Sequence, residues 1–169
     1  RRRHVSAPRL RDAAAGDAAA IARIYNHYVA HTIVTFEEAA VDEADMAGRI
    51  AEVQGQSLPW LVADEAGAVV GYAHASKWKG RCAYRYSVES TVYLDPAALG
   101  RGLGTLLYTE LLAQLARQQL HAVMGGIALP NAASVALHEK MGMRKVATFS
   151  EVGYKFGRWI DVGYWQRLL

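Results

Sequence analysis

The chain has a single cysteine, Cys82, among its 169 residues. One thiol cannot form an internal disulfide, and it cannot supply the several thiolates of a cysteine-based zinc site. The sequence therefore predicts a protein of a reducing compartment, the cytoplasm, with no internal disulfide and no bound metal.

Long apolar runs are also missing. No stretch approaches the roughly 20 apolar residues that cross a bilayer, and no segment joins a basic start, an apolar stretch and a small-residue cleavage site. The composition, 52% hydrophobic and 21% charged, is typical of a globular chain. We expect one soluble domain with its own core and no membrane contact.

Acidic residues are absent from the first eleven positions, which hold five arginines. Residues 12–169 carry 14 Lys and Arg against 16 Asp and Glu, a net charge of −2, so the overall charge of +3 comes from the N-terminus. We predict a flexible basic arm over residues 1–9, a single domain over residues 10–169, and no nucleic-acid partner.

The first half of the domain alternates helical and strand patterns. Apolar residues at three- and four-residue spacings predict helices, and runs of β-favouring residues around a glycine-containing turn predict a hairpin. The expected elements are a helix that starts near Asp17 and ends at His31, a helix over Asp42–Gln54, hairpin strands over Trp60–Asp64 and Val69–Ser76, and a long strand over Tyr84–Leu94.

Glycine is concentrated in one short segment, Leu99–Thr105, at Gly100, Gly102 and Gly104. The segment follows a predicted strand and precedes leucines spaced four residues apart, so it joins a strand to a helix. Glycines at such a junction allow backbone N–H groups and a helix N-terminus to converge on a phosphate. The spacing matches neither a Walker loop nor a dinucleotide-binding fingerprint, and a simple tight turn is the alternative.

The second half continues as a crossover unit. An apolar strand is expected over His121–Leu129, followed by a helix capped by Asn131 that runs to Met141 and stops at Gly142. The tail, residues 147–169, is rich in strand patterns. The sequence predicts an α/β fold whose helices cover a sheet of about six or seven strands.

These motifs resemble the GCN5-related N-acetyltransferase (GNAT) superfamily. Leu99–Thr105 is similar to its pyrophosphate-binding loop, Gln/Arg-x-x-Gly-x-Gly/Ala, except that Leu99 stands where the family has Gln or Arg. Asn131–Gly142 resembles the second cofactor-side motif of the family. The resemblance implies the GNAT fold, with a mixed, mostly antiparallel sheet, and acetyl-CoA as co-substrate.

The chain is more specifically similar to the phosphinothricin and methionine sulfoximine N-acetyltransferases, over residues 11–166. This resemblance implies direct acetyl transfer, with a general base, to the α-amino group of a small amino-acid analogue. It further implies herbicide or antibiotic resistance and a homodimer, whose shared surface would be the aromatic-rich tail unless those aromatics are core. The stretches that carry it are Ile24–Asn26, Trp78–Arg81, Tyr84, Val88–Tyr93, Leu137–Glu139 and Gly153–Gly163.

An amine attacks a thioester only after its ammonium has lost a proton. The resemblance assigns the general-base role to Glu89, and a solvent-facing strand carboxylate is the alternative. His138 stands where many GNAT enzymes carry tyrosine and this branch carries histidine, and it could manage the proton or bind the base. Tyr93 and Tyr108 are candidates for holding the oxyanion or protonating the leaving thiolate, although packing explains them almost as well.

The acceptor carries a carboxylate and a polar head group, which require fixed donors. Lys79, Arg81 and Tyr84 supply a cation, a bidentate fork and a hydroxyl. By resemblance these residues bind the substrate and Phe36 forms an apolar wall, whereas a solvated turn is the alternative for the cluster.

The resemblance also implies where acetyl-CoA binds: the edge of the strand, the glycine loop and the start of the following helix. Asn131 and Ser134 could instead serve only as helix caps. The implied cofactor-binding residues are Thr91, Val92, Tyr93, Leu99, Gly100, Arg101, Gly102, Leu103, Gly104, Thr105, Asn131 and Ser134.

Two rival functions remain open at this point. The same fold could acetylate another amine, such as a peptide N-terminus or an antibiotic, or it could be a non-catalytic acyl-CoA sensor. Cys82 matches no nucleophile position, so we expect no covalent acetyl-enzyme. Structural roles are expected for His27, His31, His74 and His121.

Overall fold

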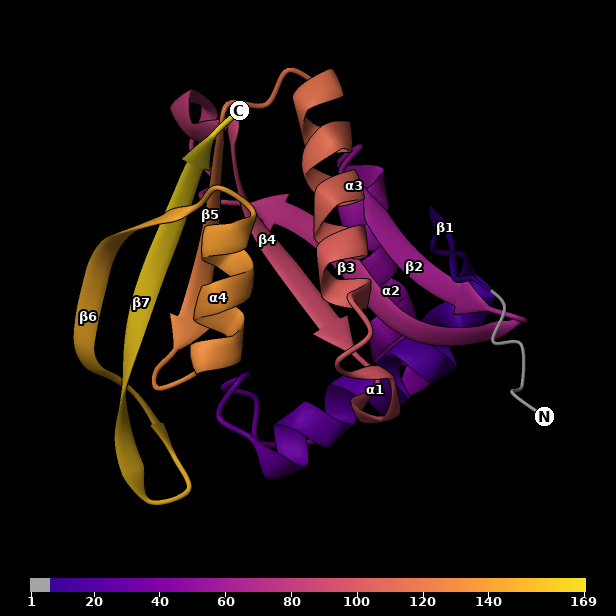
Figure 1. The fold of residues 1–169 in the computed structure, drawn as a ribbon, viewed down its shortest axis with the longest axis horizontal. Helices are drawn as coiled ribbons and strands as arrows, with labels where there is room; N and C mark the ends of the chain where they lie inside the picture. Colours follow the sequence, from indigo (N-terminus) through magenta and orange to yellow (C-terminus); the bar gives the residue numbers. More distant parts are fainter. Residues whose placement is uncertain (1–6) are drawn as a thin grey trace.

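A seven-stranded sheet forms the centre of the computed structural model, which describes residues 7–169 (Figure 1). The strand order is β1-β2-β3-β4-β5-β7-β6, and every neighbouring pair is antiparallel except β4 and β5. The predicted mixed, mostly antiparallel sheet is thus confirmed. The strands are β1 (Arg9–Asp12), β2 (Trp60–Glu65), β3 (Ala68–Lys77), β4 (Ser87–Leu94), β5 (Ala122–Ala128), β6 (Arg144–Lys155) and β7 (Arg158–Leu168).

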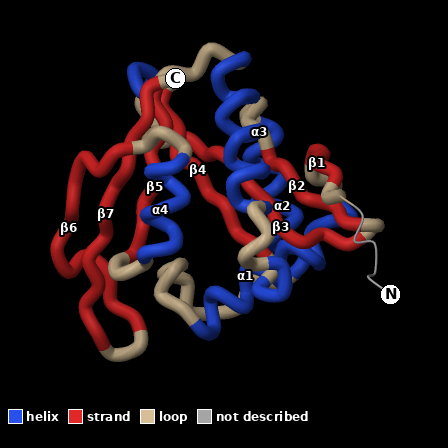
Figure 2. The backbone as a smooth tube through the Cα atoms, viewed as in Figure 1, coloured by secondary structure: helices blue, strands red, loops and turns tan. Residues whose placement is uncertain are grey.

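Helices cover both faces of this sheet (Figure 2). Tyr93 of β4 packs against Tyr25 of α1, whereas Ser90, on the opposite face of the same strand, bonds Tyr108 of α3. Since side chains alternate along a strand, α1 and α3 lie on opposite faces. The helices are α1 (Ala18–His31), α2 (Glu43–Gly55), α3 (Leu103–Arg117) and α4 (Ala132–Lys140). None of the helices within residues 7–169 is long and apolar enough to span a membrane.

The crossover unit is also confirmed, since α3 connects the parallel strands β4 and β5. Its leucines at four-residue spacing, Leu107, Leu111 and Leu115, are fully buried. Burying a leucine side chain contributes about 1.5–3 kcal/mol, so this row anchors the helix and the loop that precedes it.

Two sequence expectations need correction. The predicted basic arm, residues 1–9, overlaps strand β1, where Arg9 pairs with Asp64; residues 1–6 lie outside the described part. A four-residue strand with charged residues around Leu10 offers too little alternation to be recognised. The Arg11 guanidinium forms ion pairs with the carboxylates of Asp17, at 2.7 Å, and Asp64, at 3.1 Å.

The long strand was also predicted to begin too early. It starts at Ser87 rather than Tyr84, because Cys82–Tyr84 form a short 3₁₀ turn. Within this turn the Tyr84 N–H donates to the Arg81 carbonyl at 2.9 Å. Local turn bonds therefore override the alternating pattern at this end.

Candidate active site

A hollow of about 590 Å³ opens where β4, β5, β6 and β7 meet the loop between α1 and α2. Its walls are largely aromatic and aliphatic, and Lys79 and Glu89 are the two charged side chains among the lining residues. The lining residues are Val34, Phe36, Trp78, Lys79, Glu89, Gly126, Ala128, Phe149, Val152, Val162 and Tyr164.

Glu89 lines this hollow from β4. It is the last residue of β4 that pairs with β5, where its partner is Met124. A Cβ added at Gly126 would lie 3.3 Å from Glu89 Oε1 and 3.1 Å from the Tyr164 ring, so both side chains pack over this glycine. Burial raises the pKa of the Glu89 carboxyl, and the nearby Lys79 ammonium opposes this shift. A carboxylate with a raised pKa is a stronger base.

The acceptor-side residues fall into two groups. Phe36 and Lys79 line the hollow together with Glu89. Tyr84 instead lines a smaller, adjoining hollow of about 270 Å³, which shares Trp78, Phe149 and Tyr164 with the first. Arg81 is exposed and lines neither of them. The structure thus brings two of the four predicted substrate-binding residues to Glu89.

The glycine loop provides a cradle for an anion. Gly100 and Gly102 both have left-handed backbones, with φ of 75° and 78°. Gly102 is the N-cap of α3, and no described side chain caps the free amides of this helix end. A Cβ added at either glycine would meet no described atom within 4 Å, so the space above the loop is open. Free amides and open space fit a pyrophosphate.

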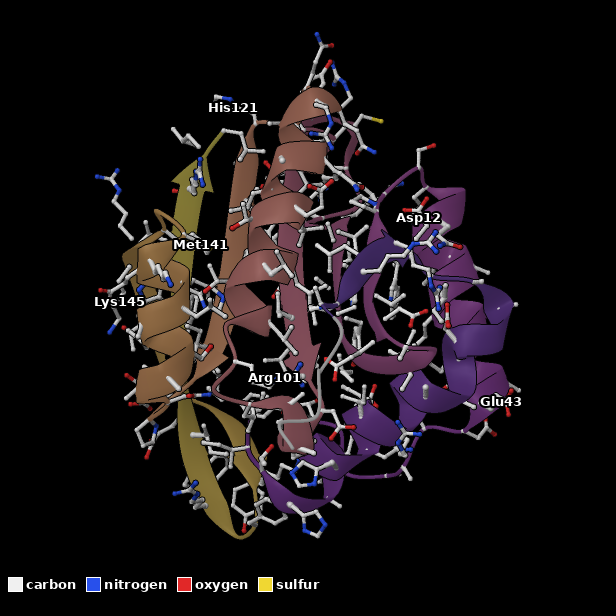
Figure 3. All side chains as sticks on the ribbon, turned by 45° about the vertical axis from the view of Figure 1, so that its right-hand side comes forward. Asp12, Glu43, Arg101, His121, Met141 and Lys145 are labelled. Carbon is white, nitrogen blue, oxygen red and sulfur yellow. The ribbon has the colours of Figure 1, made fainter. Side chains whose placement is uncertain are left out.

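The other loop residues have different surroundings. Leu99 is 57% exposed. Arg101 lies just before the start of α3 (Figure 3), and its guanidinium forms an ion pair with Glu65. Gly104 is packed closely instead, because an added Cβ would lie 3.2 Å from a Leu137 methyl of α4. The predicted loop therefore divides into an open part, Gly100–Gly102, and a packing contact at Gly104.

A gap between β4 and β5 lies beside Glu89. The two strands pair only over Ser87–Glu89 and Ala122–Met124, and they then diverge toward their carboxyl ends (Figure 1). Beyond Glu89, β4 pairs only with β3 and β5 only with β7 within the described part of the chain. The β4 backbone that borders the gap, residues 90–94, is therefore available to an extended ligand.

Two predicted catalytic residues lie where this gap begins. Tyr108 hydrogen-bonds Ser90, the first β4 residue beyond the paired section, and its ring lies 5.2 Å from the ring of His138. His138 packs on Gly125, the first such residue of β5, where an added Cβ would be 2.7 Å from Nε2. Burial raises the pKa of Tyr108 and lowers that of His138, so both rings are neutral at pH 7.

The tautomer of His138 follows from its contacts. Its Nδ1 lies 2.7 Å from the Ser134 carbonyl, which can only accept a hydrogen bond. Nδ1 therefore carries the proton in the neutral ring, and Nε2 is an acceptor. Asn131 accepts the Ser134 N–H at 3.1 Å and caps α4, which confirms the predicted cap.

Thr91 and Tyr93 do not join Glu89 through their side chains. Both line a second hollow of about 400 Å³ beside α2. The Tyr93 ring stands edge-on to Tyr25, with 5.4 Å between ring centroids, and burial raises the pKa of Tyr93. The Tyr93 ring thus belongs to an aromatic cluster on the α1 face of the sheet.

Tyr164, Gly126 and Val152 are pocket residues that the sequence analysis did not assign to the site. One signal was available, the Gly125-Gly126 pair within an apolar strand, because glycine inside a strand often marks a close approach. Here the two glycines make room for His138 on one side and for Glu89 and Tyr164 on the other. Val152 lines the hollow from a bulge in β6, and no local sequence pattern predicts that bulge.

Residues 10–163 match the family described as an acetyltransferase (GNAT) domain. The chain is 42% identical over 158 residues to the phosphinothricin N-acetyltransferase of Streptomyces viridochromogenes, covering 94% of this chain and 86% of that protein. It is 39% identical over 157 residues to the L-methionine sulfoximine/L-methionine sulfone acetyltransferase of Salmonella typhimurium, covering 93% and 92%.

The fold has a similarly close counterpart among solved structures. A GNAT superfamily phosphinothricin acetyltransferase from Sinorhizobium meliloti, crystallised in complex with acetyl-CoA, superposes with a TM-score of 0.93 at 37% identity. The alignment covers 97% of this chain and 89% of that one. The chain matches these proteins over nearly its whole length, so the glycine loop, the gap and the hollow all lie inside the shared region.

Proposed function

The chain belongs to the GNAT family of acetyltransferases and uses acetyl-CoA, and we propose that its acceptor is the α-amino group of a small amino-acid analogue. The observation that carries this proposal is the pair of charges in the hollow, Lys79 and Glu89. An α-amino acid has one ammonium and one carboxylate, so the hollow offers a partner to each. The apolar walls suit the rest of the molecule, of phosphinothricin, methionine sulfoximine or methionine sulfone type.

The proposed chemistry is direct transfer. Glu89 removes a proton from the acceptor ammonium, directly or through water, and the neutral amine attacks the thioester carbonyl. A C–N bond forms, the C–S bond breaks, and a proton is delivered to the leaving thiolate. Acetyl-CoA supplies an activated acetyl group, and the chain supplies the base.

We assign Tyr108 and His138 to the leaving-group side of this reaction. Both lie where the gap between β4 and β5 begins, next to Ser90 and Gly125. Tyr108 remains protonated at neutral pH and can donate a hydrogen bond to an oxyanion or a proton to a thiolate. Tyr93 receives no such role, because its ring packs on Tyr25 and lines the second hollow beside α2.

Cofactor binding is proposed for the glycine loop and the β4 edge. The free amides at the start of α3 suit the pyrophosphate, and the backbone of residues 91–93 suits the pantetheine arm as an added strand. Asn131 and Ser134 lie at the start of α4, beside His138, and are proposed to border the same arm.

We also propose that the protein is a homodimer. The β6–β7 hairpin exposes large apolar side chains, and a second copy of the chain is the proposed cover for them. The residues concerned, with their exposed fractions, are Phe149 50%, Val152 59%, Tyr154 55%, Phe156 59% and Trp159 63%. Sedimentation equilibrium tests this: a purely monomeric protein at micromolar concentration rejects the dimer.

Two consequences are proposed for the cell. Acetylation removes the positive charge of the acceptor amine, so an enzyme acting on phosphinothricin would confer resistance to it. Cys82 is free and exposed, which suits a reducing compartment, and we propose the cytoplasm.

The test is thiol release from acetyl-CoA against phosphinothricin, methionine sulfoximine, methionine sulfone, common amino acids, polyamines and short peptides. Calorimetry with acetyl-CoA alone is run in parallel. Turnover confined to the first three acceptors and related amino acids supports the proposal, and preferred turnover of peptides or polyamines replaces the acceptor. Tight acetyl-CoA binding without turnover of any acceptor indicates the sensor instead.

A further inference from the structure

Lys155 is a buried cation to which the proposed reaction assigns no role. It is the last residue of β6, directly before a two-residue turn, and only 2% of it is exposed. Both turn residues, Phe156 and Gly157, have positive φ values of 52° and 72°, as a tight type I′ hairpin requires. Burying an ammonium is unfavourable unless it finds hydrogen-bond acceptors, so its contacts indicate its role.

The ammonium of Lys155 reaches the loop between α1 and α2. Its Nζ donates to the Thr35 carbonyl at 2.8 Å, a contact between residues 120 positions apart. The Thr35 hydroxyl, 2.7 Å from the Tyr25 hydroxyl, ties the same residue to α1. A third contact comes from Arg49 of α2, whose guanidinium forms an ion pair with Glu37 of the loop at 2.6 Å. Thr35 is therefore fixed between α1 and the tip of the hairpin.

The residue after Thr35 forms a wall of the hollow. The ring of Phe36 lies so close to Gly153 that an added Cβ there would be 2.4 Å from a ring carbon. Gly153 precedes Lys155 by two residues and follows Val152, which lines the same hollow. The Lys155–Thr35 bond and the Phe36–Gly153 contact thus join the loop to the hairpin at two adjacent points.

We propose that these four residues, Thr35, Phe36, Gly153 and Lys155, form a clasp that sets the width of the acceptor pocket. Lys155 is a positioning residue that acts through Thr35 and Phe36, because it is not among the residues that line the hollow. The inference rests on the proposed function of the hollow as the acceptor site. It predicts that loosening the clasp weakens acceptor binding and admits bulkier amino acids, while acetyl-CoA binding is unchanged because the glycine loop lies outside the clasp.

The first experiment replaces the ammonium by an apolar group of similar length, Lys155→Met. The expected result is a rise of about tenfold or more in the acceptor KM with the acetyl-CoA KM unchanged, since small misplacements of a pocket wall weaken binding strongly. Lys145→Met is the matched control, because Lys145 lies on the same strand, near α4 (Figure 3), and its ammonium stacks on Trp165 outside the pocket. The conservative variant Lys155→Arg is expected to restore part of the affinity.

A second pair of variants tests the clasp from its other contact. Gly153→Ala places a methyl group against the Phe36 ring and should displace it. Phe36→Ala removes the obstacle, so the double variant should lose less acceptor affinity than the sum of the two single variants. Additive losses would contradict a direct contact. This pair leaves the Lys155 charge in place, so it remains informative if Lys155→Met does not fold.

Hydrogen exchange separates failure of the clasp from failure of the proposed function. In Lys155→Met, the amides of residues 33–38 should exchange faster than in the wild type, whichever acceptor the enzyme uses. Unchanged exchange together with an unchanged acceptor KM overturns the clasp. Faster exchange in a protein that acetylates none of the amino-acid analogues would instead retain the clasp and reject the acceptor assignment.

Discussion

The two halves of the proposed active site are built in different ways. The cofactor half consists of the glycine loop, the start of α3 and the free edge of β4, which are contiguous in sequence and present mainly backbone groups. The acceptor half collects side chains from the α1–α2 loop, the segment after β3, and strands β4 to β7. The backbone half should therefore respond mainly to glycine substitutions, and the side-chain half to single functional groups.

Glu89→Gln should give the largest difference between the two halves, a large loss of kcat with no loss of acetyl-CoA affinity. The amide keeps the shape of the side chain and removes the base, so kcat should fall by about 10²- to 10⁴-fold. Acetyl-CoA affinity, measured by calorimetry, should stay at the wild-type value. Glu43→Gln is the control, because Glu43 is exposed at the start of α2. Full activity of Glu89→Gln would remove Glu89 from the mechanism.

Acid pH should lower the stability of the fold and so affect both halves together, because both include residues of β4, which pairs with β3. Burial lowers the pKa of His74 on β3 to about 4, and its Nδ1 has no hydrogen-bond partner among the described residues. Above pH 6.5 the ring is neutral in both the folded and the unfolded protein. Between pH 6.5 and 4 only the unfolded chain binds the proton, so the free energy of unfolding falls, by at most about 3 kcal/mol from this group.

His74→Phe tests this directly. The phenyl ring can keep the stacking on Trp60, where the ring centroids are now 4.0 Å apart, but it cannot titrate. Urea unfolding at pH 7, 5.5 and 4 should show a smaller loss of stability in the variant than in the wild type. Part of the loss should remain, because burial also lowers the pKa of His138. Equal losses in both proteins would show that His74 titrates normally.

The cofactor half was also the part that could be predicted from sequence. A strand, a glycine loop and a helix follow one another within Ser87–Arg117, and each leaves a local signal in alternation, glycine spacing or leucine spacing. The start of β4 was misplaced, because the turn at Cys82–Tyr84 is held by local hydrogen bonds.

The acceptor half could be predicted only in part, for a physical reason. Glu89 and Lys79 carry charged groups, so the sequence alone identifies them as candidate site residues. Tyr164 and Val152 join them through the pairing of β5, β6 and β7 and a bulge in β6, which are contacts between residues far apart in sequence. Arg81 and Tyr84 are close to Lys79 in sequence, but both lie at the 3₁₀ turn and neither lines the hollow that contains Glu89. Side-chain sites assembled over long range leave little local signal.

Gly102→Ala should damage the cofactor half alone. Alanine must adopt the left-handed backbone of Gly102, at a cost of about 1–2 kcal/mol, or the loop must shift. We expect acetyl-CoA affinity, measured by calorimetry, to fall by about tenfold. The affinity for the acceptor amine should be unchanged. Gly48→Ala is the matched control: Gly48 lies inside α2 with open space around it, so alanine should stabilise the fold by about 0.5–1 kcal/mol.

Lys79→Met should give the smallest and most diagnostic effect, a change confined to the acceptor half. The Lys79 ammonium holds the pKa of Glu89 below the value that burial alone would give. Removing that charge raises the pKa of Glu89, so the acid limb of the kcat/KM profile should move to higher pH. The acceptor KM should rise about two- to fivefold through loss of the carboxylate partner, with the acetyl-CoA KM unchanged.

The control for this variant is Lys77→Met, because Lys77 lies two residues earlier and lines the second hollow beside α2. It should leave both the pH profile and the acceptor KM unchanged. A shifted limb in Lys79→Met alone places the ammonium beside the base in the working enzyme. An unshifted limb with a raised acceptor KM would mean that Lys79 binds the acceptor but does not influence Glu89, and the charge pair that carries the acceptor assignment would then act as two separate contacts.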